Sequence, residues 1–154
     1  MTTEFSTIYD ALVTRLGTTL FSGHKRLSNP YNLAQNNDQV LEKGWGLAVR
    51  EGENTNRLVG KNTTVRRSFD IVLTRKYFAR EFDAAKKADA EKTLLEDLQI
   101  LIDSAEGDTD LVPASGKYVF RYLGDSGITQ VKDDRDDFLA VVVSTSVEYF
   151  RPIP

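Results

Sequence analysis

Two stretches of alternating apolar and polar residues, 64–78 and 138–150, constrain the fold of this chain more than any other feature. In each stretch the apolar residues share one parity, that is, they occupy alternate positions. They are Phe69, Ile71, Leu73 and Tyr77 in the first stretch and Leu139, Val141, Val143, Val147 and Tyr149 in the second. Successive side chains of a strand point to opposite faces of a sheet, so each stretch predicts a long strand with one face in the core. Pro152 and Pro154 should end the second strand, because they withdraw backbone donors.

A helical apolar stripe between the two stretches predicts a long helix over residues 83–104. The stripe contains Ala84, Ala88, Leu95, Leu98, Ile102 and Ala105, is flanked by Leu94 and Leu101, and is followed by Gly107. A shorter stripe from Phe5 to Leu16 predicts a first helix that stops at Gly17. Three shorter strands are predicted over 44–50, 119–123 and 127–131, the last two joined by a hairpin turn.

Turn-forming residues fill the remaining segments. Residues 17–44 are rich in Gly, Ser, Asn and Gln, which predicts an ordered but irregular excursion, and residues 51–63 predict an exposed loop. The sequence contains no repeat and no linker that would separate domains, so we expect residues 1–154 to form a single domain. The order of elements predicts an α+β fold, in which a mainly antiparallel β-sheet has two helices packed on one face.

The charge balance argues against a protein that binds by neutralising phosphates. Twenty Lys and Arg residues oppose twenty-three Asp and Glu residues, for a net charge of -3. The absence of cysteine excludes disulfides, thiol nucleophiles and thiolate metal sites. No apolar run approaches the roughly 20 residues of a membrane-spanning helix, and the first residues lack the features of a secretory signal. We therefore expect a soluble protein, made in the cytoplasm, with no membrane partner.

Motifs for catalysis and cofactor binding are missing from the sequence. It contains neither a G-x-x-x-x-G-K-[ST] loop nor G-x-G-x-x-G after a predicted strand. His24 is the only histidine and lies beside Lys25 and Arg26, so we expect a solvated loop residue and not a general base. The sequence thus predicts no catalytic residue, no cofactor and no bound metal, and a protein that is not an enzyme.

Four carboxylates lie within five residues, at Asp133, Asp134, Asp136 and Asp137. Such a cluster is able to ligate a hard cation through oxygen, although its spacing is not that of a calcium loop. A solvated acidic turn before a strand is a second interpretation. A third is a charged surface that repels polyanions or pairs with a basic neighbour in an oligomer.

Basic residues are concentrated on the first long strand, at Arg66, Arg67, Arg75 and Lys76. Together with Phe69 and Tyr77 they suggest a stacking platform for single-stranded nucleic acid. The two aromatic residues share the core parity, however, which favours a salt-bridged surface or a contact between subunits. Trp45, between two glycines, is predicted to anchor either the core or an interface.

The order of these elements resembles that of the tail terminator, or tail completion, proteins of long-tailed bacteriophages. An Asp-Arg-Asp-Asp run leading into Phe138–Phe150 is similar to the final strand of that family. Val65–Phe78 followed by an amphipathic helix is similar to its middle. The resemblance is one of architecture and extends over most of the chain.

The resemblance implies a structural virion protein at the neck end of a viral tail. Proteins of this family assemble as a hexameric ring that caps the tail tube, stops its polymerisation and presents a surface to the head connector. The implied partners are further copies of the chain, the major tail tube protein and a head connector or stopper protein. DNA passes through the bore without specific binding, and the subunits lie in the host cytoplasm during virion assembly.

Three groups of residues become candidate contacts if the chain forms such a ring. The candidate lumen or ring-contact acids are Asp133, Asp134, Asp136 and Asp137; the candidate contacts between subunits are Trp45, Arg66, Arg67, Arg75 and Lys76; the candidate inter-ring loop holds Glu51, Glu53, Asn54, Asn56 and Arg57. A head-to-tail ring closes only if each subunit offers two different complementary patches. An acidic bore lets DNA pass, whereas a cationic bore would hold its phosphates.

Three alternatives stay open at this point. Another neck component, such as a head-side connector or stopper, would share most of these features. A metal-dependent enzyme would use the carboxylates of Asp133 to Asp137, and would lose its activity or its bound metal on Asp136→Ala and Asp137→Ala. A nucleic-acid binding module would show salt-sensitive DNA binding that depends on Arg66 and Arg67.

Overall fold

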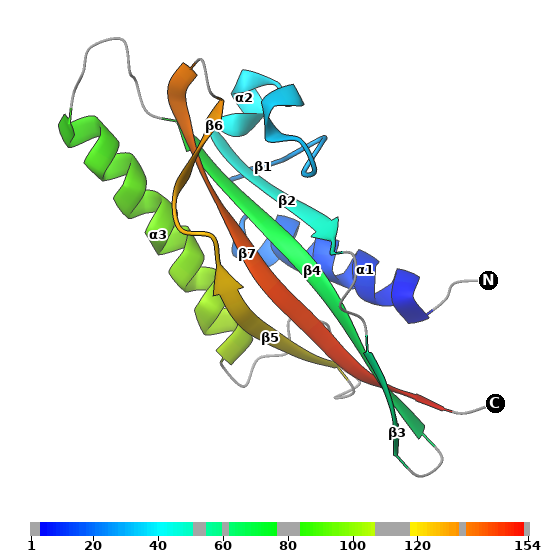
Figure 1. Ribbon diagram of the computed structural model, residues 1–154. Helices are drawn as coiled ribbons and strands as arrows, with labels where there is room; N and C mark the ends of the chain where they lie inside the picture. The colour runs from blue at the N-terminus through cyan, green and yellow to red at the C-terminus, as the bar shows by residue number, and fades with distance from the viewer. Residues whose placement is uncertain are drawn as a thin grey trace.

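The computed structural model of the chain describes residues 4–50, 55–59, 62–76, 84–106, 118–132 and 135–152 (Figure 1). The helical elements are α1 (Glu4–Thr14), a π-helical turn that continues it (Arg15–Leu20), a 3-10 turn (Leu33–Gln35), α2 (Asp38–Leu41) and α3 (Ala84–Glu106). The strands are β1 (Lys25–Arg26), β2 (Lys43–Val49), β3 (Thr55–Val59), β4 (Asn62–Lys76), β5 (Tyr118–Asp125), β6 (Thr129–Lys132) and β7 (Arg135–Pro152). Within these ranges, no helix is both long and apolar enough to cross a membrane.

β4 and β7 form the centre of the sheet. All 15 residues of β4 pair with β7, from Asn62 opposite Pro152 to Lys76 opposite Phe138. The strand order is β1-β2-β4-β7-β5, while β3 pairs with β4 and β6 pairs with β7. Every pair is antiparallel except β1 with β2. The two alternating stretches of the sequence are therefore the strands that organise the sheet.

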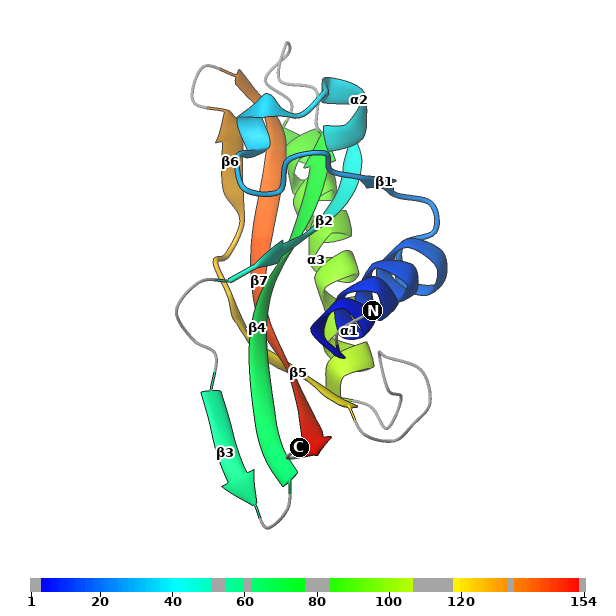
Figure 2. The same ribbon diagram turned by 90° about the vertical axis from the view of Figure 1, so that its right-hand side faces the viewer.

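The apolar parity of these strands faces α1 and α3, which cover the same face of the sheet (Figure 2). The buried core residues include Ile8, Leu12 and Leu16 from the first helix, Leu94, Leu98 and Leu101 from α3, and Trp45, Leu47, Phe69, Ile71, Leu73, Leu139, Val141, Val143 and Val147 from the sheet. Full burial of one such side chain contributes about 1.5–3 kcal/mol, so this layer is the main hydrophobic contact of the fold. The predicted α+β fold with two helices on one face is confirmed.

Residues 27–41 cover the opposite face at one end of the sheet. Leu27 and Leu41 pack there with Val72 and Phe138 in a second apolar cluster. The buried amide of Asn36 orders this segment: its Nδ2 donates to the carbonyl oxygens of Asn29, Asn32 and Leu33 at 2.8, 3.2 and 3.0 Å. Side-chain hydrogen bonds of this kind take the place of a helix or strand ladder in an irregular segment.

Two of the sequence predictions for the strands were wrong. Residues 55–59, which fall in the predicted exposed loop, form β3 and pair with β4. The predicted strands at 119–123 and 127–131 do correspond to β5 and β6, but they are not a hairpin, because both pair with β7. Turn formers around these short strands indicated chain reversals correctly and gave no information on the pairing partner.

β7 also continues further than predicted, through Arg151 and Pro152. Beyond Tyr149, which lies opposite Tyr118, β5 contributes no further pair to β7. Among the described residues, β7 there pairs only with β4, and a proline is tolerated at a strand end that pairs on one side.

Candidate assembly surfaces and a buried polar cluster

One end of the sheet extends beyond both covering helices (Figures 1 and 2). It consists of β3 together with residues 62–66 of β4 and 148–152 of β7, a region that we call the arm. Within the described residues β3, β4 and β7 pair along the arm, and the start of β5 adds a fourth strand at its base, opposite Glu148 and Tyr149. A small fold that extends a sheet past its own core offers backbone and side chains to another molecule.

The four predicted basic contacts do not form one surface. Arg66 lies at the base of the arm, opposite Glu148, whereas Arg75 and Lys76 lie at the other end of β4. Arg67 shares the parity of the core residues and is half-buried. Lys76 pairs with Glu42, with 3.7 Å between Nζ and Oε1, and lies over the ring of Phe138. Although all four residues lie on β4, they lie at opposite ends of the strand and on different faces of the sheet.

Trp45 lies in the core, with only 3% of its surface exposed. A Cβ on Gly17 would come within 3.1 Å of the indole ring, so the first helix approaches Trp45 closely because that position is glycine. The guanidinium of Arg26 covers the outer side of the ring, 5.5 Å from its centroid. Of the two roles predicted for Trp45, the structure thus shows the core role, and the residue presents little surface to a neighbouring subunit.

The predicted acids and loop residues lie partly outside the described residues. This holds for Asp133, Asp134, Glu51, Glu53 and Asn54. Asp136 and Asp137 lie in β7, directly after Arg135, which is the backbone pairing partner of Lys132 in β6. Asn56 and Arg57 belong to β3 and so to the arm, opposite Val65 and Thr64 of β4.

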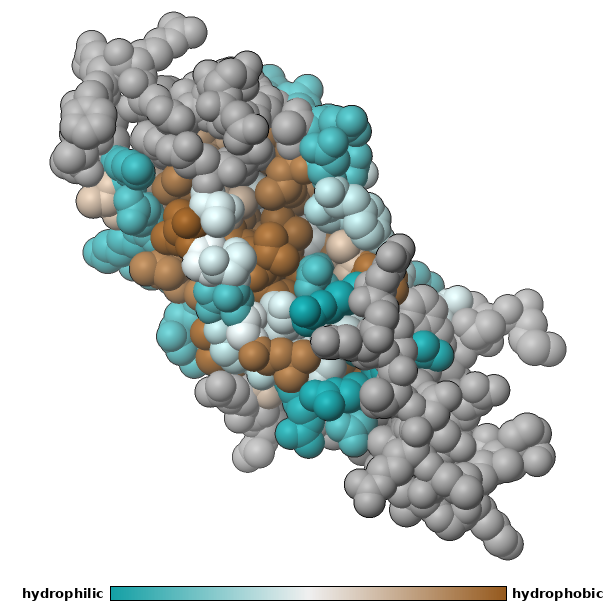
Figure 3. All heavy atoms as spheres, in the orientation of Figure 1, coloured by the Kyte–Doolittle hydropathy of each residue, from teal (hydrophilic) through white to brown (hydrophobic). Residues whose placement is uncertain are grey.

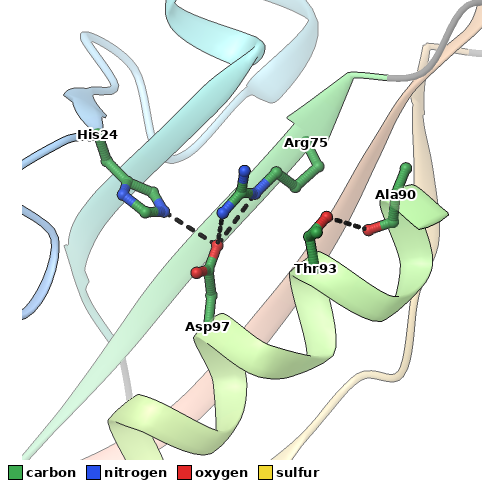
Figure 4. Close-up of polar contacts among 5 residues, drawn as sticks. All are labelled: His24, Arg75, Ala90, Thr93 and Asp97. Atoms are coloured by element: carbon green, nitrogen blue, oxygen red, sulfur yellow. Dashed lines mark hydrogen bonds and ion pairs between the residues drawn. The ribbon is translucent and has the colours of Figure 1, made fainter.

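A buried polar cluster joins three segments that are far apart in sequence (Figure 4). Asp97 of α3 accepts hydrogen bonds at Oδ2 from Arg75 of β4, at 3.1 Å from Nε and 2.8 Å from Nη2. The same oxygen lies 2.9 Å from Nε2 of His24, which precedes β1. Only 7% of the Asp97 side chain and 6% of the His24 side chain are exposed. Because a carboxylate only accepts hydrogen bonds, we assign the imidazole proton to Nε2.

This cluster corrects the prediction for His24. The side chain is buried against Asp97 and the ring of Phe21, whose centroid lies 4.9 Å away, and is not a solvated loop residue. Sequence reasoning also missed Asp97, although a signal was present. Asp97 occupies a position on the same helical face as Leu94, Leu98 and Leu101, and a carboxylate within an apolar stripe indicates a buried cationic partner.

The electrostatics of the cluster favour an ionised carboxylate. Burial by itself raises the pKa of Asp97, but the hydrogen bonds from His24 and Arg75 and their charges outweigh burial, and the net pKa is lowered. Asp70, on the opposite face of the sheet, has a raised pKa instead. Burial raises the pKa of Asp70, and the charge of Arg50 only partly offsets this effect. The cluster thus holds the segment before β1 against α3 and β4 with charged hydrogen bonds.

The described residues include no group of three or more His, Cys, Asp or Glu side chains arranged to hold a metal ion. Thr93, one turn before Asp97, donates its hydroxyl to the carbonyl of Ala90 and takes no part in the cluster (Figure 4). With one carboxylate oxygen shared between Arg75 and His24, the arrangement acts as a positioning contact for three elements.

Comparison with known proteins adds no assignment to this geometry: no protein-family model matches the chain, and no curated protein is similar to it in sequence.

Proposed function

We propose that this chain is a structural, non-enzymatic virion protein, a tail terminator that forms a hexameric ring on the end of a phage tail tube. The observation that carries the proposal is the arm, a sheet extension that continues past α1 and α3 (Figure 1). An extension of this kind on a small α+β fold is suited to reach an adjoining subunit or ring, because the sheet there continues beyond the covering helices.

The two edges of the sheet support the same proposal. β1 has only two residues, so it covers β2 along part of its length, and β5 forms the opposite edge. Each copy therefore offers two different edges, as a closed head-to-tail ring requires. In this proposal the acids at 133–137 face the bore or a ring contact, the segment 51–57 reaches an adjoining ring, and DNA passes without specific binding.

Native mass spectrometry tests the ring directly. We expect a hexamer in free solution, or a monomer that becomes a hexamer when the tail tube protein of the same virus is added. The neck-component alternative also predicts a ring, but one that binds the head connector and not the tube. A chain that remains monomeric with and without tube protein contradicts the proposal and the alternative together.

A further inference from the structure

The most exposed large hydrophobic side chains of the described residues are unevenly distributed. Tyr31 is 70% exposed and lies beside the β1–β2 edge, while Leu95 and Ile100 are 50% and 44% exposed and lie on α3. Leu123 of β5 is the fourth, on the sheet face opposite the helices. β1 is the edge strand of the sheet beyond β2, whereas α3 packs on the face formed by β4, β5 and β7. Exposed apolar side chains bordered by polar residues are typical of interaction surfaces.

The surface around Tyr31 is basic, and we call it the basic edge. Lys25 and Arg26 of β1 and Lys43 of β2 are exposed there. Arg26 is held in place by the Trp45 ring and by the hydroxyl of Tyr9, 3.5 Å from its Nη2. Glu42, the nearest acid in sequence to Lys43, pairs with Lys76. The buried cluster at His24 fixes the chain directly before Lys25, so these cations have a defined position.

A groove lies beside the basic edge, where the segment after β1 packs along β2. The amide of Leu27 donates to the carbonyl of Trp45 at 2.7 Å, and the amide of Val49 donates to the Tyr31 hydroxyl at 3.3 Å. Tyr31 therefore packs along β2 beyond the end of β1, and Leu47 beneath it is buried. Next to it is a groove of about 370 Å³ lined by Tyr9, Arg26, Pro30, Tyr31 and Leu47, among others.

The outer face of α3 has the opposite charge, and we call it the acidic helix face. Asp89, Glu96 and Asp103 are exposed and follow at seven-residue intervals, which places them along one line of the helix. Ile100 lies between Glu96 and Asp103 on this line, and Leu95 lies beside it. Lys92 is the one cation between residues 88 and 105. Figure 3 shows hydrophobic and hydrophilic residues side by side over this part of the molecule.

We propose that the acidic helix face of one copy docks on the basic edge of a second copy. Glu96 and Asp103 then meet Lys25, Arg26 and Lys43, and Ile100 meets the groove beside Tyr31. The two surfaces have opposite charges, and each carries exposed apolar side chains. Two copies of the same surface would repel each other, because their charges are alike. This pairing favours a heterologous contact over a two-fold dimer. The inference rests on the proposed ring and names the surfaces that close it.

Cysteine cross-linking tests the contact without interference, since the chain contains no cysteine. Lys25→Cys and Glu96→Cys proteins are prepared separately, and a short bis-maleimide, which adds to two thiols, is applied to each protein alone and to an equal mixture. We expect covalent dimers in the mixture and not in either protein alone. The control mixture pairs Lys25→Cys with Arg121→Cys. Arg121 is exposed on the sheet face opposite α1 and α3, away from the acidic helix face. Dimers of one protein alone, or equal yields in the control, overturn the proposal, as does the absence of cross-linking.

Charge reversal supplies a second readout. Lys25→Glu with Arg26→Glu, or Glu96→Lys with Asp103→Lys, should each weaken association by about tenfold or more, and mixing the two proteins should restore it. Ile100→Asn should weaken association, whereas Leu123→Asn, similarly exposed, should not. Reversed proteins that associate normally overturn the inference.

The contact and the proposed function fail in different ways. A hexamer that caps tubes without cross-linking overturns this contact alone. A cross-linked head-to-tail ring that ignores tube ends overturns the terminator function alone.

Discussion

Replacing Asp97 by alanine is expected to lower the free energy of unfolding by about 3–5 kcal/mol, because it leaves the mostly buried Arg75 and the buried His24 without their shared partner. Chemical denaturation followed by circular dichroism measures the difference. Asp10→Ala is the control, since Asp10 is also a helical carboxylate but is exposed on α1, away from the cluster. We expect the control to change stability by no more than about 0.5 kcal/mol.

The pH dependence of this difference follows from the lowered pKa of Asp97. A carboxyl whose pKa is lower in the folded state stabilises the protein fully above its unfolded pKa, near 3.9, and loses that stabilisation as the pH falls through the folded pKa. The difference in the free energy of unfolding between the native protein and Asp97→Ala should therefore be largest at neutral pH and should decrease below about pH 4. A gap that is small at neutral pH, or constant into acid, contradicts the role given to the cluster.

Phe69→Ala is expected to cost about 3–5 kcal/mol of folding stability, because it opens a cavity at the centre of the main core. Phe69 is fully buried on β4, and its carbonyl accepts a 3.0 Å hydrogen bond from the buried hydroxyl of Thr145 on β7. Leu123→Ala is the control: Leu123 is 42% exposed, and its truncation should cost far less. Equal losses for the two variants would show that Phe69 is not at the centre of the core.

The elements that the sequence predicts best are those with strong periodicity. The alternation in 64–78 and 138–150 identified β4 and β7, and the helical spacing of apolar residues in 83–104 identified α3, because each pattern repeats with the period of its own element. The predicted buried face of α3 was partly wrong: Leu94, Leu98 and Leu101 are buried, whereas Ala88 and Leu95 are exposed. The apolar parity gave the core-facing residues Phe69, Ile71 and Leu73 correctly.

What the sequence could not give is the pairing of distant segments. β3 and β6 are short strands that pair with β4 and β7. A local sequence pattern indicates a strand but does not indicate which distant strand it pairs with. The same applies to the polar cluster. His24 and Asp97 are 73 residues apart, and only the folded sheet brings both of them to Arg75. Local charge suggested that Arg75 belonged with Arg66 and Lys76 on one surface, whereas burial assigns it to Asp97.

The central claim is that this subunit is built to join copies of itself on the end of a tube. Electron microscopy of tubes, assembled from the tail tube protein of the same virus and incubated with this protein, tests that claim most directly. We expect a ring-shaped density of six subunits at one end of each tube, and tubes that stop growing when further tube protein is added. Bare tube ends, with continued growth at an unchanged rate, would contradict it.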